Sequence, residues 1–210
     1  MLNKGIKMRI IFTLFFIISV VFASSSNFVI KGGDAVQSII EFNIGDISID
    51  EKEGYHVISS SSRGNTQNIG EPELPSYTFN YSINYNSNYD VTIEENDYVI
   101  YNDIELYPSQ PIYNVNQDKI FIKDDIAYSK NTVYPLSKIS SKRATLRGYD
   151  LLTIELIPYE YNPQTKELKV FSNIDVIITE SGLRDTPSRA PRSRIFESMY
   201  NNSVINSDDY

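Results

Sequence analysis

The sequence predicts an all-β protein, an antiparallel β-sandwich of jelly-roll type that ends in a linker and a short C-terminal helix. From Phe28 onward, Val, Ile, Thr, Tyr and Phe recur in short runs that alternate apolar with polar residues. Asn, Asp, Gly, Ser and Pro interrupt these runs at close spacing, and few stretches have helical periodicity. Many short half-buried strands joined by turns are typical of two packed antiparallel sheets.

Residues 1–23 have the composition of an export signal that is removed from the mature protein. The chain opens with a short basic segment that contains Lys4, Lys7 and Arg9. The apolar run that follows is about 13 residues long, whereas a membrane-spanning helix needs about 20. Small residues then offer a cleavage site between Ala23 and Ser24, or two residues further on. The mature protein is therefore expected to be secreted or extracytoplasmic, in the periplasm or on the cell surface, with no membrane segment.

Charge and composition exclude several classes of function. The formal net charge is −8, and it becomes −11 when the three basic residues of the signal are lost. Such an acidic chain repels phosphate backbones, so nucleic acid is not an expected partner. The sequence contains no cysteine, which excludes thiolate metal sites and a cysteine nucleophile. No cofactor is expected, and the acidic pairs at 124–125 and 208–209 lack the spacing of a calcium loop.

The sandwich domain is expected over residues 27–182, and its strands follow from alternation at period two. Three runs show this pattern and predict strands, at 89–94, 97–101 and 119–123. Ile104 and Leu106 continue the second run. Alternation of this kind places one face of each strand in the core and the other in water.

The clearest pattern lies between residues 148 and 180. The first part of it carries three apolar residues on one face, Leu152, Ile154 and Leu156. The second part repeats the pattern with Ile174, Val176 and Ile178. Asn162 and Pro163 lie between the two parts and mark a turn, because proline fixes φ at the first corner. We therefore expect one long antiparallel hairpin.

After the sandwich, residues 183–194 are expected to form an exposed linker, because Pro, Ser and Arg dominate them. Ser193 is a potential N-cap for a short helix that follows. In that helix Ile195 and Met199 are four residues apart, as are Phe196 and Tyr200. Residues 195–210 are expected to begin the junction to a following domain, against which the helix buries its apolar face.

A series of short motifs punctuates the strands. The first is a G-x-P-x-L-P segment, formed by Gly70, Pro72, Leu74 and Pro75. The later ones contain, in order, Pro108, Pro135, Arg147, Gly148, Pro158, Tyr161 and Pro163. As an ordered set, these motifs resemble the N-terminal propeptides of the gingipain family of cysteine peptidases. The resemblance extends over roughly residues 35–206 and includes the segment 196–206, which resembles the connection from propeptide to catalytic domain.

This resemblance implies an all-β propeptide that assists the folding of a cognate cysteine peptidase domain and keeps that domain latent. The enzyme of this family is a caspase-like endopeptidase with a Cys–His dyad. The present chain has no cysteine and a single histidine, His56, so it is not expected to be an enzyme itself. His56 lies in a run that predicts a strand, where a structural role is expected. The catalytic groups would belong to a following domain.

A propeptide of this kind is expected to block the active-site cleft with a loop. In members specific for arginine or lysine, a basic side chain would fill the acidic specificity pocket. Three candidates lie in the loop between Pro111 and Pro135, namely Lys119, Lys123 and Lys130. A second candidate pair is Lys142 and Arg143. The alternative for each is a solvated side chain on a β-surface.

Activation cleavage is predicted in the linker, because proteolysis concentrates in exposed segments rich in small and polar residues. The linker offers four basic sites, Arg184, Arg189, Arg192 and Arg194. A linker without a processing role is the alternative interpretation.

The competing function is that of an independent extracellular β-sandwich that binds glycan or a surface protein. Sixteen tyrosines supply aromatic faces for such binding, although cross-strand pairs and rim positions in a sandwich are the preferred explanation for them. That interpretation predicts an aromatic patch on one face. A pro-segment instead predicts an exposed apolar edge with no partner in the chain.

Overall fold

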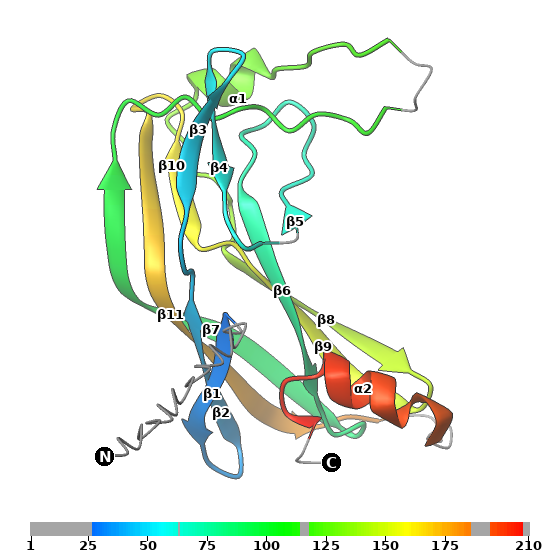
Figure 1. Ribbon diagram of the computed structural model, residues 1–210. Helices are drawn as coiled ribbons and strands as arrows, with labels where there is room; N and C mark the ends of the chain where they lie inside the picture. Colours follow the sequence, from blue (N-terminus) through cyan, green and yellow to red (C-terminus); the bar gives the residue numbers. More distant parts are fainter. Residues whose placement is uncertain (1–26, 63, 114–117, 186–193, 208–210) are drawn as a thin grey trace, which may run out of the picture.

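A computed structural model describes residues 27–62, 64–113, 118–185 and 194–207 of the chain, which form the predicted β-sandwich (Figure 1). The first sheet contains β1 (Phe28–Gly33), β2 (Gln37–Asn43), β7 (Ser87–Tyr101), β10 (Tyr159–Asn162) and β11 (Glu167–Leu183). Strand β7 pairs with one edge of β11, while β10 and β2 follow one another along its other edge. The second sheet has the order β5 (Gly64–Asn65), β6 (Pro75–Ser82), β9 (Tyr149–Leu156) and β8 (Ile139–Leu146). A separate hairpin is formed by β3 (Ser48–Lys52) and β4 (Tyr55–Ser59).

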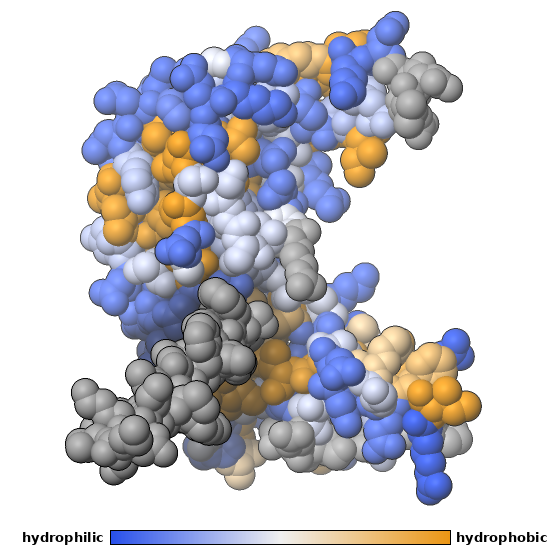
Figure 2. Space-filling view, viewed as in Figure 1, coloured by the Kyte–Doolittle hydropathy of each residue, from blue (hydrophilic) through white to orange (hydrophobic). Residues whose placement is uncertain are grey.

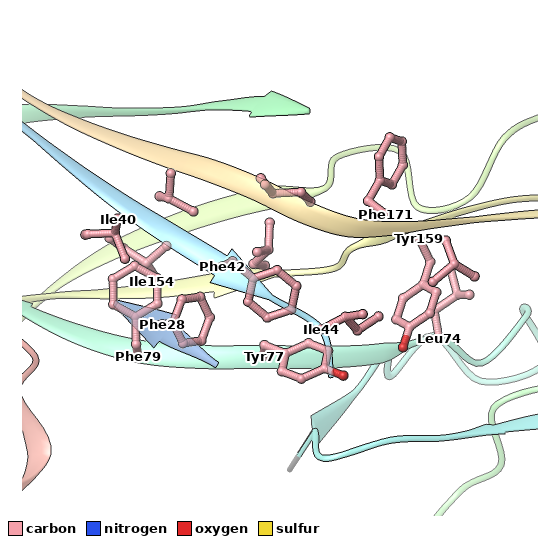
Figure 3. Close-up of a cluster of buried hydrophobic side chains, with 14 of the residues drawn as sticks. Phe28, Ile40, Phe42, Ile44, Leu74, Tyr77, Phe79, Ile154, Tyr159 and Phe171 are labelled. Carbon is pink, nitrogen blue, oxygen red and sulfur yellow. The ribbon is translucent and has the colours of Figure 1, made fainter. Parts of the chain in front are cut away.

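The core lies between the two sheets and confirms the predicted alternation. Aromatic side chains from both sheets point toward one another there (Figure 3). The ring of Phe42 on β2 lies 5.0 Å from that of Phe28 and 4.8 Å from that of Tyr77 on β6, centroid to centroid. The two predicted apolar faces are buried, one from β9 with Leu152, Ile154 and Leu156 and one from β11 with Ile174, Val176 and Ile178.

The prediction of one long hairpin between residues 148 and 180 is wrong. Strand β9 pairs with β6 and β8 in the second sheet, and only the short β10 pairs with β11. The chain changes sheets between Leu156 and Tyr159, at Pro158, which has no N–H to continue a ladder. Alternation determines which face of a strand is buried, but it does not determine which strand lies beside it.

The predicted strands at 89–94 and 97–101 form one continuous strand, β7, with irregular pairing near Asn96. The pattern does not continue as predicted, because β7 ends at Tyr101 and Leu106 makes only an isolated bridge with His56. The strand predicted at 119–123 is absent. The backbone of Ile122 bonds to a glutamine side chain instead of a neighbouring strand. A short helix that the sequence did not predict follows, α1 (Asp125–Ser129).

The predicted C-terminal helix exists as η1 (Arg194–Phe196) and α2 (Glu197–Ser203). Phe196 is its N-cap and makes no side-chain cap bond, while Ser193 lies outside the described residues. The helix packs on the lower end of β8 and β9 (Figure 1), where Tyr200 is buried. The expectation that its apolar face is kept for a following domain is therefore wrong for Tyr200. Ile195 and Met199 do remain exposed, at 89% and 47%.

Some predicted features lie outside the described residues. These are the signal with Ala23 and Ser24, and two of the linker arginines, Arg189 and Arg192. Within residues 27–62, 64–113, 118–185 and 194–207, no helix is both long and apolar enough to cross a bilayer.

Candidate functional site

A loop between β7 and α1 projects from one end of the sandwich, opposite the end that carries α2 (Figure 1). We call residues 110–123 the arm; the tip, 114–117, lies outside the described residues. The side-chain amide of Gln110 closes the base of the arm, because its Nε2 donates to the Ile122 carbonyl at 2.6 Å and its Oε1 accepts from the Ile122 N–H at 2.9 Å. Further out, the Tyr113 hydroxyl donates to the Ile120 carbonyl. The two sides of the arm are thus joined at two levels.

The G-x-P-x-L-P segment supports the base of the arm. The Gly70 N–H donates to the Ser109 carbonyl at 2.8 Å, and the Asp124 N–H donates to the Gly70 carbonyl at 3.0 Å. Gly70 therefore contacts the chain where it enters the arm and where it leaves it. Its φ of +86° lies in the left-handed region that favours glycine. An added Cβ would lie 3.0 Å from the Asp124 nitrogen, so a larger residue is disfavoured for a second reason.

Gly70→Ala is expected to lower the free energy of unfolding by more than Gly54→Ala. Both glycines have positive φ, which costs an alanine about 1 kcal/mol, but Gly54 has open space where a Cβ would stand. The additional loss at Gly70 measures the close contact with Asp124. Urea unfolding of both variants gives the comparison, and equal losses would show that the contact at the arm base is unimportant.

The C-terminal side of the arm is fixed by Lys123. Its ammonium lies 3.1 Å from a carboxylate oxygen of Glu105 and 4.5 Å from the ring centroid of Tyr128. Glu105 also pairs with Lys166 at 2.8 Å. Asp124 then caps α1, because its Oδ1 accepts from the N–H groups of Ile126 and Ala127. The charge of Lys123 is thus neutralised within the chain.

The other candidate blocking residues differ in their surroundings. Lys119 is exposed on the arm, Lys130 is exposed just after α1, and Lys142 is exposed on β8. Arg143 is half-buried, and its guanidinium donates to the Ser87 carbonyl of β7 and lies 3.9 Å from an Asp150 carboxylate oxygen. Arg143 therefore connects the two sheets. Of the five candidates, Lys119 combines a place on the arm with an exposed side chain.

The arm also carries apolar side chains in water, which the sequence analysis did not single out. Ile112 is fully exposed, and Ile120, Phe121 and Ile122 are exposed as well. Figure 2 shows hydrophobic residues on the arm and a hollow beneath it. Exposed apolar residues gathered on one projection indicate a contact surface. The signal in the sequence is the Ile-Phe-Ile run at 120–122, although its composition predicts a strand.

Two hollows lie beside the base of the arm. One, of about 690 Å³, lies against the short strand β5 and is lined in part by Thr66, Ile69 and Ile112. The other, of about 560 Å³, is lined in part by Tyr107, Lys119 and Phe121. Glu73, Gln110 and Pro111 line both. Burial raises the pKa of the Glu73 carboxyl, and the charge of Lys52 partly opposes this rise.

The remaining motif residues occupy turns and the core. Pro72 and Pro108 face each other in an isolated bridge, Pro75 begins β6, and Leu74 is buried. Arg147 and Gly148 form the turn between β8 and β9 with positive φ, and Pro163 lies in the turn between β10 and β11. The peptide bond between Tyr134 and Pro135 is cis. Tyr134 exchanges two backbone hydrogen bonds of 2.8 Å with Tyr161.

Tyr161 holds the segment that leads toward the arm. Its side chain is buried, and its hydroxyl donates to the Ile104 carbonyl at 2.9 Å and accepts from the Leu106 N–H at 3.3 Å. Burial raises the pKa of Tyr161 to about 12, although the Leu106 N–H partly opposes this. The hydroxyl is therefore protonated in the folded chain over the whole neutral range.

This shift predicts a loss of stability in alkali. A tyrosine in the unfolded chain ionises near pH 10, roughly two units below Tyr161 in the folded chain. Its contribution is complete below about pH 10 and is lost as pH rises toward 12, since the unfolded chain releases the proton first. Urea unfolding between these pH values should show a smaller slope of stability against pH for Tyr161→Phe than for the wild type. Equal slopes in Tyr161→Phe and the wild type would contradict this assignment.

Of the tyrosines that the structure describes, Tyr85 and Tyr98 are exposed. Seven others are buried: Tyr77, Tyr81, Tyr107, Tyr149, Tyr159, Tyr161 and Tyr200. His56 has a structural role, because its Nδ1 accepts from the Glu105 N–H at 3.1 Å. In the described part of the chain, no three His, Cys, Asp or Glu side chains are placed to hold a metal ion.

The family described as Propeptide_C25 matches residues 36–210, most of the chain. The chain belongs to this family of C25 peptidase propeptides. Among solved structures, this propeptide is similar to a chain in a structure of the complex of the pro- and mature domains of RgpB from Porphyromonas gingivalis. The TM-score is 0.76 and the sequence identity is 16%, and the match covers 88% of this chain and 99% of that chain. It is also similar to a chain in a structure concerned with the zymogenic latency of gingipain K from the same organism. Here the TM-score is 0.64 and the sequence identity is 18%, and the match covers 77% of this chain and 96% of that chain. At such identities the similarity shows the fold. No curated protein matches the propeptide.

Proposed function

We propose that this propeptide binds the C25 cysteine peptidase domain with which it is made, assists its folding and keeps it latent. The arm is the observation that carries the proposal, since it projects from the sandwich, is fixed at its base and exposes apolar side chains. The similar RgpB structure is a complex of pro- and mature domains, which supports a peptidase domain as the partner. The sequence has no cysteine and hence no thiol nucleophile, so the parent enzyme would provide the endopeptidase activity.

Inhibition would be steric, with the arm lying across the active-site cleft. Ile112, Ile120 and Phe121 would supply most of the binding energy by leaving water, as apolar residues at the centre of interfaces do. Lys119 is the basic side chain placed to enter an acidic specificity pocket. A base held by Gln110 and Gly70 limits the conformational entropy that the arm loses on binding.

The signal at residues 1–23 supports action outside the cytoplasm, and the linker arginines remain the predicted processing sites. Of these, Arg184 follows the end of β11 and Arg194 begins η1. Cleavage between them would cut the chain at the boundary between the sandwich and its C-terminal segment.

The test is inhibition of the mature peptidase from the same source by residues 24–210. We expect saturable inhibition at one propeptide per enzyme. The remaining enzyme activity is measured as the rate of hydrolysis of a peptide substrate. Lys119→Ala should weaken inhibition more than Lys142→Ala if Lys119 enters the specificity pocket. A chain that is folded by circular dichroism and does not inhibit at micromolar concentration would contradict the proposal.

A further inference from the structure

The C-terminal segment, residues 194–207, is held by the sandwich through a small core of its own. We call this segment the clasp. Tyr200 is almost completely buried, and its ring stacks on that of Tyr149 with centroids 4.2 Å apart. Its hydroxyl donates to the hydroxyl of Ser82 on β6. Val204 and Leu151 complete the cluster, which is separate from the main core.

The clasp then pairs with the edge of β6 as an added strand would. The Ile205 N–H donates to the Asn80 carbonyl at 3.1 Å, and the Asn80 side chain donates to the Ser203 carbonyl at 3.3 Å. The buried Asn206 amide continues the pairing, because its Oδ1 accepts from the Ser82 N–H at 2.6 Å and its Nδ2 donates to the Ser82 carbonyl at 3.2 Å. Addition of an extended segment to a sheet edge is a common mode of peptide binding.

We propose that the clasp is a peptide ligand of the sandwich that stays bound after the chain is cut between Arg184 and Arg194. Its burial and its hydrogen bonds involve residues on β6 and β9, and none of these contacts depends on the covalent connection through the linker. The N-terminal side of the cut is fixed as well, since the Arg184 N–H donates to the Asn86 carbonyl at 2.8 Å. The match to the propeptide family also continues through the linker to the end of the clasp.

A bound clasp has a consequence for processing, which rests on the proposed function. If the linker is cut during processing, the clasp and any domain that follows it remain attached to the sandwich by noncovalent contacts. A cut in the linker would therefore nick the propeptide without releasing the peptidase. Release would need a second cut after Asn206, or dissociation of the clasp from β6.

The experiment uses residues 24–210 with the linker residues 186–192 replaced by the recognition site of a sequence-specific protease that leaves the wild-type chain intact. After complete cutting, size-exclusion chromatography with mass spectrometry of the fractions shows whether the C-terminal fragment travels with the sandwich. We expect both fragments in one peak in native buffer and two separate peaks in denaturing guanidinium chloride. A C-terminal fragment with the unchanged clasp sequence that elutes apart from the sandwich in native buffer would overturn the proposal.

Variants identify the contacts that retain the fragment. Asn206→Ala and Tyr200→Ala should each speed its dissociation by about tenfold or more, because each leaves a buried polar group of Ser82 without its partner. Met199→Ala and Ile195→Ala lie on the same segment with exposed side chains and should leave the dissociation rate unchanged. Equal effects of Met199→Ala and Tyr200→Ala would contradict the assigned contacts. Inhibition of the peptidase by the uncut chain is measured in parallel. If the cut fragment dissociates while the uncut chain still inhibits, the bound clasp is disproved and the inhibitory role stands. If the fragment stays bound while the uncut chain does not inhibit, the inhibitory role is disproved and the bound clasp stands.

Discussion

Replacing Ile112 and Ile120 together with aspartate is expected to raise the inhibition constant of the propeptide by about 100-fold or more, since two apolar side chains at the centre of an interface contribute roughly 1–2 kcal/mol each. Both side chains are exposed on the arm, so the folded propeptide has little to lose from the change. The unfolding temperature should therefore stay at the wild-type value. Enzyme titration and thermal unfolding of the same preparation give the two results.

A matched control separates contact from charge. Leu183→Asp places the same carboxylate on an aliphatic residue that is 80% exposed at the end of β11, away from the arm. Inhibition by this variant should be close to that of the wild type. Equal inhibition by the Ile112→Asp, Ile120→Asp double variant and the wild type would show that the arm does not contact the enzyme. Weakened inhibition by Leu183→Asp would instead place the contact at the other end of the sandwich.

The fold class could be predicted from the sequence because burial repeats at period two along each strand. Leu152, Ile154 and Leu156 were assigned to one face, and all three are in the core. The partner of each strand could not be predicted in this way. Strands β9 and β11 have the same alternation, and only the change of sheet at Pro158 places them in different layers.

The candidate site was predicted only in part. The loop after Pro111 was singled out for its lysines, and Lys119 does lie exposed on the arm. The apolar part of the site was missed because Ile120, Phe121 and Ile122 have the composition of a strand. The backbone of Ile122 bonds to the Gln110 amide instead of a neighbouring strand, a contact that periodicity does not encode.

The C-terminal helix illustrates the same limit. Two spacings of four residues, Ile195 with Met199 and Phe196 with Tyr200, predicted one apolar face, yet Tyr200 is buried while Ile195 and Met199 are exposed. Tyr200 has hydrogen-bond and stacking partners on β6 and β9 that the spacing of the helix alone does not reveal. Long-range partners, rather than local pattern, decided which side of this helix is covered.

Leu74→Ala is expected to cause the largest loss of stability among the residues of the G-x-P-x-L-P motif. Leu74 has 0% of its surface exposed, in the main core directly before β6. Removing a buried leucine side chain leaves a cavity and costs about 2–5 kcal/mol. For a domain of this size the unfolding temperature should fall by roughly 6–12 °C for each 3 kcal/mol lost. Thermal unfolding followed by circular dichroism measures the change.

The chain offers a matched control for Leu74, because Leu74 and Leu136 both line a third, smaller hollow of about 130 Å³ and Leu136 is 87% exposed. Leu136→Ala should leave the unfolding temperature within about 1 °C of the wild type, since little buried area is lost. Inhibition by Leu74→Ala, measured well below its transition, should persist because the arm itself is unchanged. A variant that stays folded but no longer inhibits would show that the Leu74 side chain also fixes the position of the arm. Equal unfolding temperatures for the two alanine variants would contradict the burial of Leu74 and, with it, the packing of the G-x-P-x-L-P motif into the core.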